Sequence, residues 1–370
     1  MLGTLKSGNL VFGSQGKGED VGNAEEVPST SVSLGKIDLV GGDTIMINSG
    51  QAITIRGDGE KLITSDSGDV KLLVGSKDNG AGTLNLGDAG LTSGGSLDGT
   101  LSIADESTVN VRAGMFSIST MEGTSSSAIT IGTAQNAGGL TVGKASLNGA
   151  NVFLDPAWKD GGNLVSDASI GVFESFANGA VDGRFAVGRN SLLVLGDKDS
   201  AWAQKAVQDA LDNADLTWGK DSVTAALAIK SSQKLSATGA LLVDGSLATA
   251  PSVTENTATF AGQSLLVVNA AAADGEGALQ GDGTSRLSVD GGAKLHIMDV
   301  KGSQEYTVTS GFVNDKIEGW QGDDLIVSRL FNAAVNTDGG KFVVKTEAKR
   351  PDEFSQYAIP NILAAIASGN

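Results

Sequence analysis

The chain reads Gly82-Thr-Leu-Asn-Leu-Gly87, then Gly99-Thr-Leu-Ser-Ile103, then Ser107-Thr-Val-Asn-Val111, three segments with one alternation of apolar and polar residues. Side chains alternate between the two faces of a strand, so each segment can bury two aliphatic residues and expose the polar residues beside them. A strand this short is unstable alone and needs neighbours on both edges. The stretch therefore predicts a fold in which many short strands stack on one another.

The same alternation recurs along most of the chain, and glycine-containing turns separate its occurrences. The spacing between equivalent segments varies between about 10 and 20 residues, which favours a solenoid with variable corners over a β-propeller with its longer blades. The apolar pairs that we expect to line its interior are Ile37/Leu39, Ile45/Ile47, Ile53/Ile55, Leu72/Val74, Leu84/Leu86, Leu101/Ile103, Val109/Val111, Phe116/Ile118, Ile129/Ile131, Leu140/Val142, Phe185/Val187, Leu193/Leu195, Leu241/Val243, Leu265/Val267, Leu287/Val289, Leu295/Ile297 and Tyr306/Val308.

Two stretches interrupt the pattern. The first, Phe153-Leu-Asp-Pro-Ala-Trp158, is aromatic and predicts a protruding corner or a packed turn. The second begins at Asp199, a plausible helix N-cap, and continues to residue 213 with an apolar helical face. That face consists of Trp202, Ala206, Val207, Ala210 and Leu211. We expect a surface helix packed on the solenoid, followed by a strand from Thr224 to Ile229.

The C-terminal part is denser in apolar and aromatic residues. An open stack exposes the edge of its last strand, so a terminal cap is physically required. We expect residues 1–305 to form rungs with the helical insertion near 199–213, residues 306–350 to form the cap, and residues 351–370 to form a short linker or helix. Pro360 to Ala367 has the pattern of such a helix, with proline in its first turn.

Composition limits the possible partners. The 370 residues carry a net charge of −17, which argues against nucleic acid or an anionic membrane as a partner. Cysteine is absent, which excludes disulfides and thiolate metal sites. No apolar run is long enough for a membrane-spanning helix. Met1 to Lys6 lacks the pattern of a signal peptide, so for an exported protein we expect the targeting segment to lie outside this sequence.

Several short motifs suggest chemistry, but none has the pattern that the chemistry needs. The one histidine, His296, lies between Leu295 and Ile297 and is expected to point outward into solvent rather than serve a catalytic triad. Ser65-Asp-Ser67-Gly-Asp69 is similar to a serine-protease nucleophile loop but lacks the glycine that should precede it. Asp323 and Asp324 should face opposite sides of a strand, which prevents them from sharing a substrate.

The glycine-rich motifs have equally ordinary interpretations. The Asp-Gly segments 57–59, 274–277 and 281–283 predict turns, because calcium-binding β-rolls need their ligands in tandem repeats. The segment 13–18 has the wrong spacing for a phosphate loop. We therefore predict no catalytic, cofactor-binding or metal-binding residue.

The whole pattern resembles the β-helical passenger domains of classical (type V) autotransporters of Gram-negative bacteria. The resemblance is carried by the Gly-x-Leu-x-Val/Ile rungs, the absence of cysteine, the acidic polar surface, and the segments 153–158, 199–202 and 216–219. It implies a right-handed parallel β-helix, an autochaperone-like cap near 306–347, and a tail at 359–368 that leads toward an outer-membrane barrel. No barrel or signal peptide is recognisable, so we interpret the sequence as an excised passenger fragment.

This resemblance implies display on the cell surface or secretion, and a non-enzymatic role in adhesion or self-association. Expected partners are surface glycans or proteins of a host or of bacteria, or a second copy of the chain, and no nucleic acid. Two alternatives stay open. β-Helices also serve as scaffolds for polysaccharide-degrading enzymes, and a rod can act as a spacer without a partner.

Overall fold

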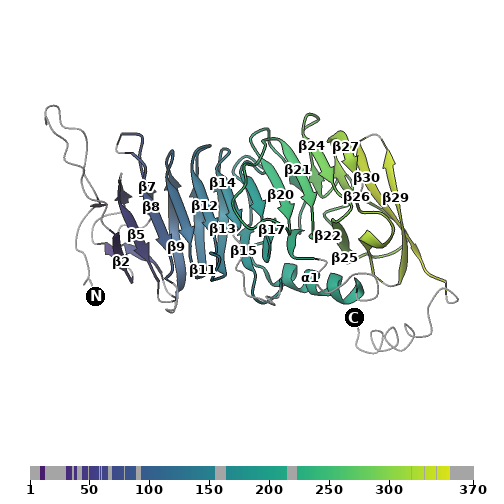
Figure 1. The fold of residues 1–370 in the computed structure, drawn as a ribbon, viewed down its shortest axis with the longest axis horizontal. Coiled ribbons are helices and arrows are strands. Elements are labelled where there is room, and N and C mark those ends of the chain that lie inside the picture. The colour runs from purple at the N-terminus through teal and green to yellow at the C-terminus, as the bar shows by residue number, and fades with distance from the viewer. Residues whose placement is uncertain are drawn as a thin grey trace.

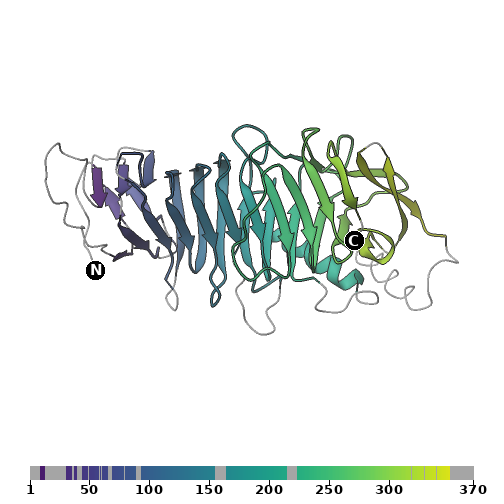
Figure 2. The same ribbon diagram turned by 45° about the horizontal axis from the view of Figure 1, so that its top comes forward.

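The computed structural model describes residues 9–12, 31–35, 37–39, 44–48, 50–57, 59, 61–65, 69–78, 80–88, 93–154, 164–214, 223–317, 319–328, 330–338 and 340–350. The described chain forms a long rod in which successive coils stack along one axis (Figure 1). Figure 2 shows the same stack from a second direction, with its strands crossing the rod axis.

Two long parallel sheets form the main walls of the rod. In the described chain the first has 12 strands. Its order is β1 (Asn9–Phe12), β4 (Thr44–Ile47), β7 (Val70–Val74), β9 (Gly94–Ile103), β11 (Gly114–Glu122), β13 (Gly138–Ser146), β15 (Ser169–Phe173), β17 (Ser191–Leu195), β18 (Ala225–Ile229), β22 (Ser264–Asn269), β25 (Lys294–Met298) and β28 (Leu325–Ile326).

The second wall has 11 described strands. Its order is β2 (Ser31–Leu34), β5 (Ala52–Ile55), β8 (Thr83–Leu86), β10 (Thr108–Val111), β12 (Ala128–Ile131), β14 (Asn151–Leu154), β16 (Arg184–Val187), β20 (Ala240–Asp244), β21 (Thr257–Ala261), β24 (Arg286–Val289) and β27 (Val313–Ile317). A third, shorter sheet runs β19 (Gln233–Lys234), β23 (Leu279–Gln280), β26 (Glu305–Ser310), β30 (Lys341–Ala348) and β29 (Phe331–Asp338), and β3 (Ile37–Leu39) pairs with β6 (Ile63–Ser65).

The register of the strands explains why the repeated pattern gives this fold. Val109 of β10 pairs with Leu84 of β8 on one side and Ile129 of β12 on the other, and all three side chains are buried. Each such aliphatic side chain contributes about 1.5–3 kcal/mol by leaving water. Rows of these residues along the axis form the interior, so the chain is a parallel β-helix, as the alternation predicted.

Glycine is required at some corners between the walls. Gly87 has a φ of +81°, and a Cβ placed on it would lie 2.0 Å from the carbonyl oxygen of Ala113 in the next coil. Only glycine combines this left-handed conformation with so close a backbone approach. The turn at the end of β8 therefore depends on this residue.

The predicted helix is present as α1 (Ala201–Ala214). Its first backbone bond runs from the Gln204 N–H to the Ser200 carbonyl, so Ser200 occupies the N-cap position. The Asp199 carboxylate instead accepts the Ala201 N–H at 3.0 Å. The helix connects β17 to β18, which are parallel neighbours in the first wall. A parallel crossover needs a long return path, and α1 provides it across the outer face of the wall (Figure 1).

The wall beneath α1 is apolar on both faces. Ala203, Ala206, Val207 and Ala210 are fully buried against outward residues of β17, β18 and β22, while Trp202 and Leu211 are partly buried. The expectation that Leu265 and Val267 line the interior is therefore wrong. Leu265 and Val267 face the helix, and Leu266 and Val268 line the interior. Every residue from Ser264 to Val268 is buried, so the run lacks the alternation that would identify its inner face.

The pairing changes at the C-terminal end of the rod. β26 and β29 both pair with β30 in antiparallel fashion. The resulting hairpin β29–β30 lies over the end of the coil, where Trp320 is buried with its ring centroid 5.3 Å from that of Phe342. The expected cap boundary at residue 306 stays a prediction. Residues 155–158 and the expected helix at 360–367 lie outside the described residues.

No helix in the described part of the chain is both long and apolar enough to cross a membrane.

Candidate functional site

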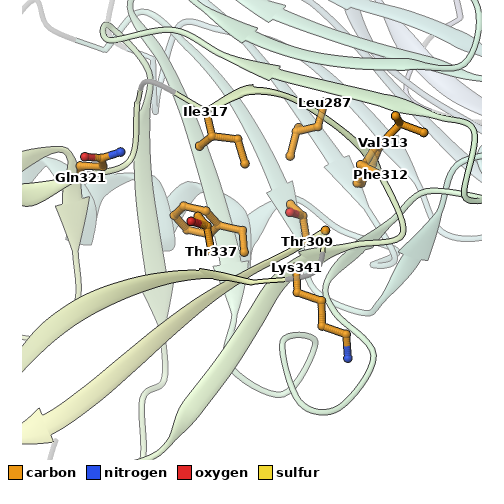
Figure 3. Close-up of a pocket in the computed structure, with 10 residues that line it drawn as sticks. Leu287, Thr309, Phe312, Val313, Ile317, Gln321, Thr337 and Lys341 are labelled. Atoms are coloured by element: carbon orange, nitrogen blue, oxygen red, sulfur yellow. The ribbon is translucent and has the colours of Figure 1, made fainter.

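A pocket of about 250 Å³ lies where the second wall meets the terminal hairpin (Figure 3). Its lining comes from β24, β26, β27, the segments beside them, and the hairpin. The lining residues are Leu287, Thr309, Phe312, Val313, Ile317, Gln321, Thr337, Gly340, Lys341 and Phe342.

The fold positions an apolar floor beneath a polar rim. Leu287, Phe312 and Phe342 are buried, whereas 48% of Val313 is exposed. Leu287 and Ile317 lie beside each other on one side of the pocket, and Thr337 lies on the opposite side (Figure 3). This opening exists because the second wall ends at β27, beside a hairpin that belongs to the third sheet.

The described lining of the pocket is largely apolar and carries a few polar groups. Its polar groups are threonine hydroxyls, the Gln321 amide and the Lys341 ammonium, and the Lys341 side chain extends away from the pocket (Figure 3). General acid–base catalysis needs a group that exchanges protons near the operating pH, and this lining holds no carboxylate or imidazole.

The expectation that His296 is solvated is wrong. Its side chain does point outward from the coil, in one row with Val194, Ala228 and Val267, but α1 covers that row. His296 is therefore only 3% exposed. Its Nδ1 lies 3.2 Å from the Ile326 carbonyl oxygen, and the described chain offers no hydrogen-bond partner to Nε2. Burial lowers the pKa of His296 to about 4, so the ring is neutral at physiological pH.

The acidic pair near the end of the chain has a different geometry from the one expected. Asp323 and Asp324 lie in a 3₁₀ turn, Gly322–Asp324, rather than on a strand. Asp324 forms an ion pair with Lys294, whose side chain is mostly buried, while Asp323 is exposed. The two carboxylates therefore lie in different environments, Asp324 in an ion pair and Asp323 on the surface.

The Asp-Gly segment at 281–283 forms a turn, as predicted. The Asp282 carboxylate accepts the backbone N–H groups of Thr284 and Ser285, each at 2.8 Å, and both hydroxyls. These hydrogen bonds, the Thr284 N–H foremost, hold the pKa of Asp282 well below its usual range. Within the described residues no group of three or more His, Cys, Asp or Glu side chains could hold a metal ion.

Some motifs fall outside the described residues. Asp66, Ser67 and Gly68 of the protease-like segment lie there, as do Asp58 and the whole segment 13–18. Their expected roles remain predictions.

The outer face of the second wall carries a polar ladder on β5, β8 and β10. Asn85 donates through Nδ2 to the Thr54 hydroxyl at 3.4 Å, and Asn110 donates to Asn85 Oδ1 at 3.0 Å. Thr130 continues this row on β12. Thr83 and Thr108 form a second row beside it. Thr54 and Asn85 are buried, so the accessible hydroxyl and amide groups of this face are those of Thr83, Thr108, Asn110 and Thr130.

The fold and these surfaces define a class, a parallel β-helix with a polar ladder on its second wall and a pocket whose described lining residues include no carboxylate or imidazole. No protein-family model, curated protein or solved structure matches the chain.

Proposed function

We propose that the chain is a surface-displayed passenger rod of the autotransporter type, which acts without catalysis in adhesion or self-association. The polar ladder on β5, β8, β10 and β12 is the observation that carries this proposal. A regular β-helix presents similar groups at each coil, so contacts that are individually weak act together. Candidate partners are surface glycans or proteins, or a second copy of the rod, and the expected location is the cell surface or the medium.

The ladder is suited to polar partners. The partly exposed residues Thr83, Thr108, Asn110 and Thr130 offer hydroxyl and amide groups that both donate and accept hydrogen bonds, whereas Asn85 is buried beside Asn110. Their strands are stacked in register, so the groups lie at the strand spacing of about 4.8 Å. Sugar hydroxyls and the polar side chains of another rod can both match such an array.

Beads coated with the purified rod test this proposal. We expect the beads to clump or to bind a glycan or protein array, and we expect Thr108→Lys with Thr130→Lys to reduce the signal several-fold by introducing bulk and charge. Ser117→Lys, on the exposed outer face of the first wall, is the matched control. Absence of clumping and of binding by the unmodified rod would remove the proposal and leave the spacer alternative.

The enzymatic alternative has its own test. Polysaccharide-cleaving β-helices need carboxylates that converge on the substrate. Turnover of any member of a polysaccharide panel by the purified chain would replace the adhesive function with a catalytic one.

A further inference from the structure

The last strand of the third sheet, β29 (Phe331–Asp338), has no strand partner on its outer edge among the described residues. It ends the strand order of its sheet and lies at the outermost C-terminal end of the rod (Figure 1). Natural proteins usually protect such edges with charged residues, proline or short length. From Phe331 to Thr337 this strand has neither charge nor proline, in a chain whose net charge is −17.

The alternation of hydrogen-bonded pairs in the β29–β30 hairpin shows which backbone groups of β29 face its outer edge. Asp338 pairs with Lys341 across the hairpin, and the Lys349 N–H donates to the Leu330 carbonyl. Bonded and non-bonded positions alternate along an antiparallel pair, so the even-numbered residues of β29 bond to β30. The N–H and C=O groups of Phe331, Ala333, Val335 and Thr337 consequently point toward the open edge.

The polar and apolar side chains of β29 are arranged nearly symmetrically about Ala334, and only the outermost pair, Phe331 and Thr337, differs in character. Two copies that pair antiparallel around this residue place Ala333 opposite Val335 of the second copy, and Phe331 opposite Thr337. Phe331, Ala333 and Val335 already pack on the core of their own rod, so the two apolar faces become continuous. On the exposed face, Asn332 comes opposite Asn336, a pairing of amides that can donate and accept.

We propose that β29 joins two copies of this chain through a two-fold symmetric, antiparallel edge-to-edge pairing centred on Ala334. An isologous contact of this kind closes after two subunits and does not propagate into fibres. The uncharged strand lets two acidic rods meet without apposing carboxylates along the contact. Because it supplies a specific contact for self-association, this inference rests on the proposed function.

A single cysteine tests the register. The chain has no cysteine of its own, so Ala334→Cys provides one thiol per copy. Ala334 occupies a non-hydrogen-bonded position at the proposed axis, where opposing Cα atoms lie about 4.5 Å apart, within disulfide range. In a glutathione redox buffer we expect Ala334→Cys to form a covalent dimer at least tenfold faster than Ser117→Cys, an exposed control in mid-rod. Equal rates would overturn the proposal.

A charge exchange provides the second test. Ala334→Asp should weaken the dimer about tenfold in analytical ultracentrifugation, because two carboxylates meet at the axis. Ala334 is exposed and lies opposite Lys345 in its own hairpin, so the fold should tolerate this change. Mixing Ala334→Asp with Ala334→Lys should restore pairing as heterodimers. Failure to restore it, with both variants folded by circular dichroism, would contradict the proposed axis.

The two proposals can fail separately. Dimers that depend on residue 334, together with beads that neither clump nor bind, would support the edge contact and remove the adhesive function. Beads that clump while all the 334 variants behave like the unmodified chain would preserve that function and remove the edge contact.

Discussion

Replacing His296 with valine should remove a specific acid sensitivity from this protein. The side chain is buried between the first wall and α1, and valine occupies the equivalent position at Val194 and Val267. The substitution therefore continues an existing apolar row. It also removes Nε2, which the described chain leaves without a hydrogen-bond partner.

The size of the expected change in the free energy of unfolding follows from the linkage between protonation of His296 and folding. The folded pKa of about 4 lies below the usual histidine pKa of about 6.5, so the unfolded chain binds the proton more tightly. The folded chain therefore has its full stability above about pH 6.5, where His296 is neutral in both states. It loses stability as the pH falls toward 4, because the unfolded chain takes up the proton first. A shift of about 2.5 units corresponds to about 3 kcal/mol of the free energy of unfolding.

Neighbouring charges modulate this shift but do not reverse it. Burial is the largest cause, the Ile326 carbonyl opposes it, and Asp209 and Asp299 raise the pKa slightly while Lys205 lowers it. Because His296 is the one histidine of the chain, the difference between the unmodified chain and His296→Val isolates its contribution.

Urea unfolding at pH 7.5, 6.0, 5.0 and 4.5, followed by tryptophan fluorescence, measures this difference. We expect His296→Val to gain relative stability steadily as the pH falls, by about 2–3 kcal/mol across the range. An NMR titration of the His296 ring should give a pKa near 4. A pKa near 6.5, or stability curves that run parallel at all four pH values, would refute the assigned burial of this ring.

Three further substitutions test the packing. Val207→Asp places a carboxylate in the fully buried contact of α1 with the first wall and should cost about 3 kcal/mol or more in urea unfolding, whereas exposed Lys205→Ala should change little. Trp320→Ala opens a cavity beneath the terminal hairpin and should cost about 3–5 kcal/mol, with faster proteolysis of the hairpin; unchanged cleavage would contradict its capping role. Gly87→Ala should destabilise by more than about 1 kcal/mol because of its positive φ and close backbone contact, and Gly291→Ala, with open space around it, should be tolerated; equal thermal melts would oppose this reasoning.

The alternation of aliphatic and polar residues was sufficient to predict the coils where one face of each strand meets solvent. Val109 and Val111 lie inside the coil because their polar neighbours cannot. The helix was equally predictable, because Ala206, Val207 and Ala210 recur at helical spacing. Both signals are local, and each depends only on residues that are close in the sequence.

The failures have one physical cause, which is contact between distant segments. Leu265 and Leu266 are equally apolar, and only the position of α1 decides which of them faces the helix. His296 follows a strand pattern that predicts exposure, and the same helix, about 90 residues earlier in the sequence, covers it.

The sequence alone determined that this chain stacks short strands into a solenoid and carries one surface helix, because side-chain alternation and helical periodicity are set by neighbouring residues. Tertiary structure decided where the helix rests, why one imidazole is dehydrated, and how the last strands reverse to leave β29 as an edge. These features depend on which segments meet in space, and that information lies in the pairing of the walls rather than in any single stretch of the chain.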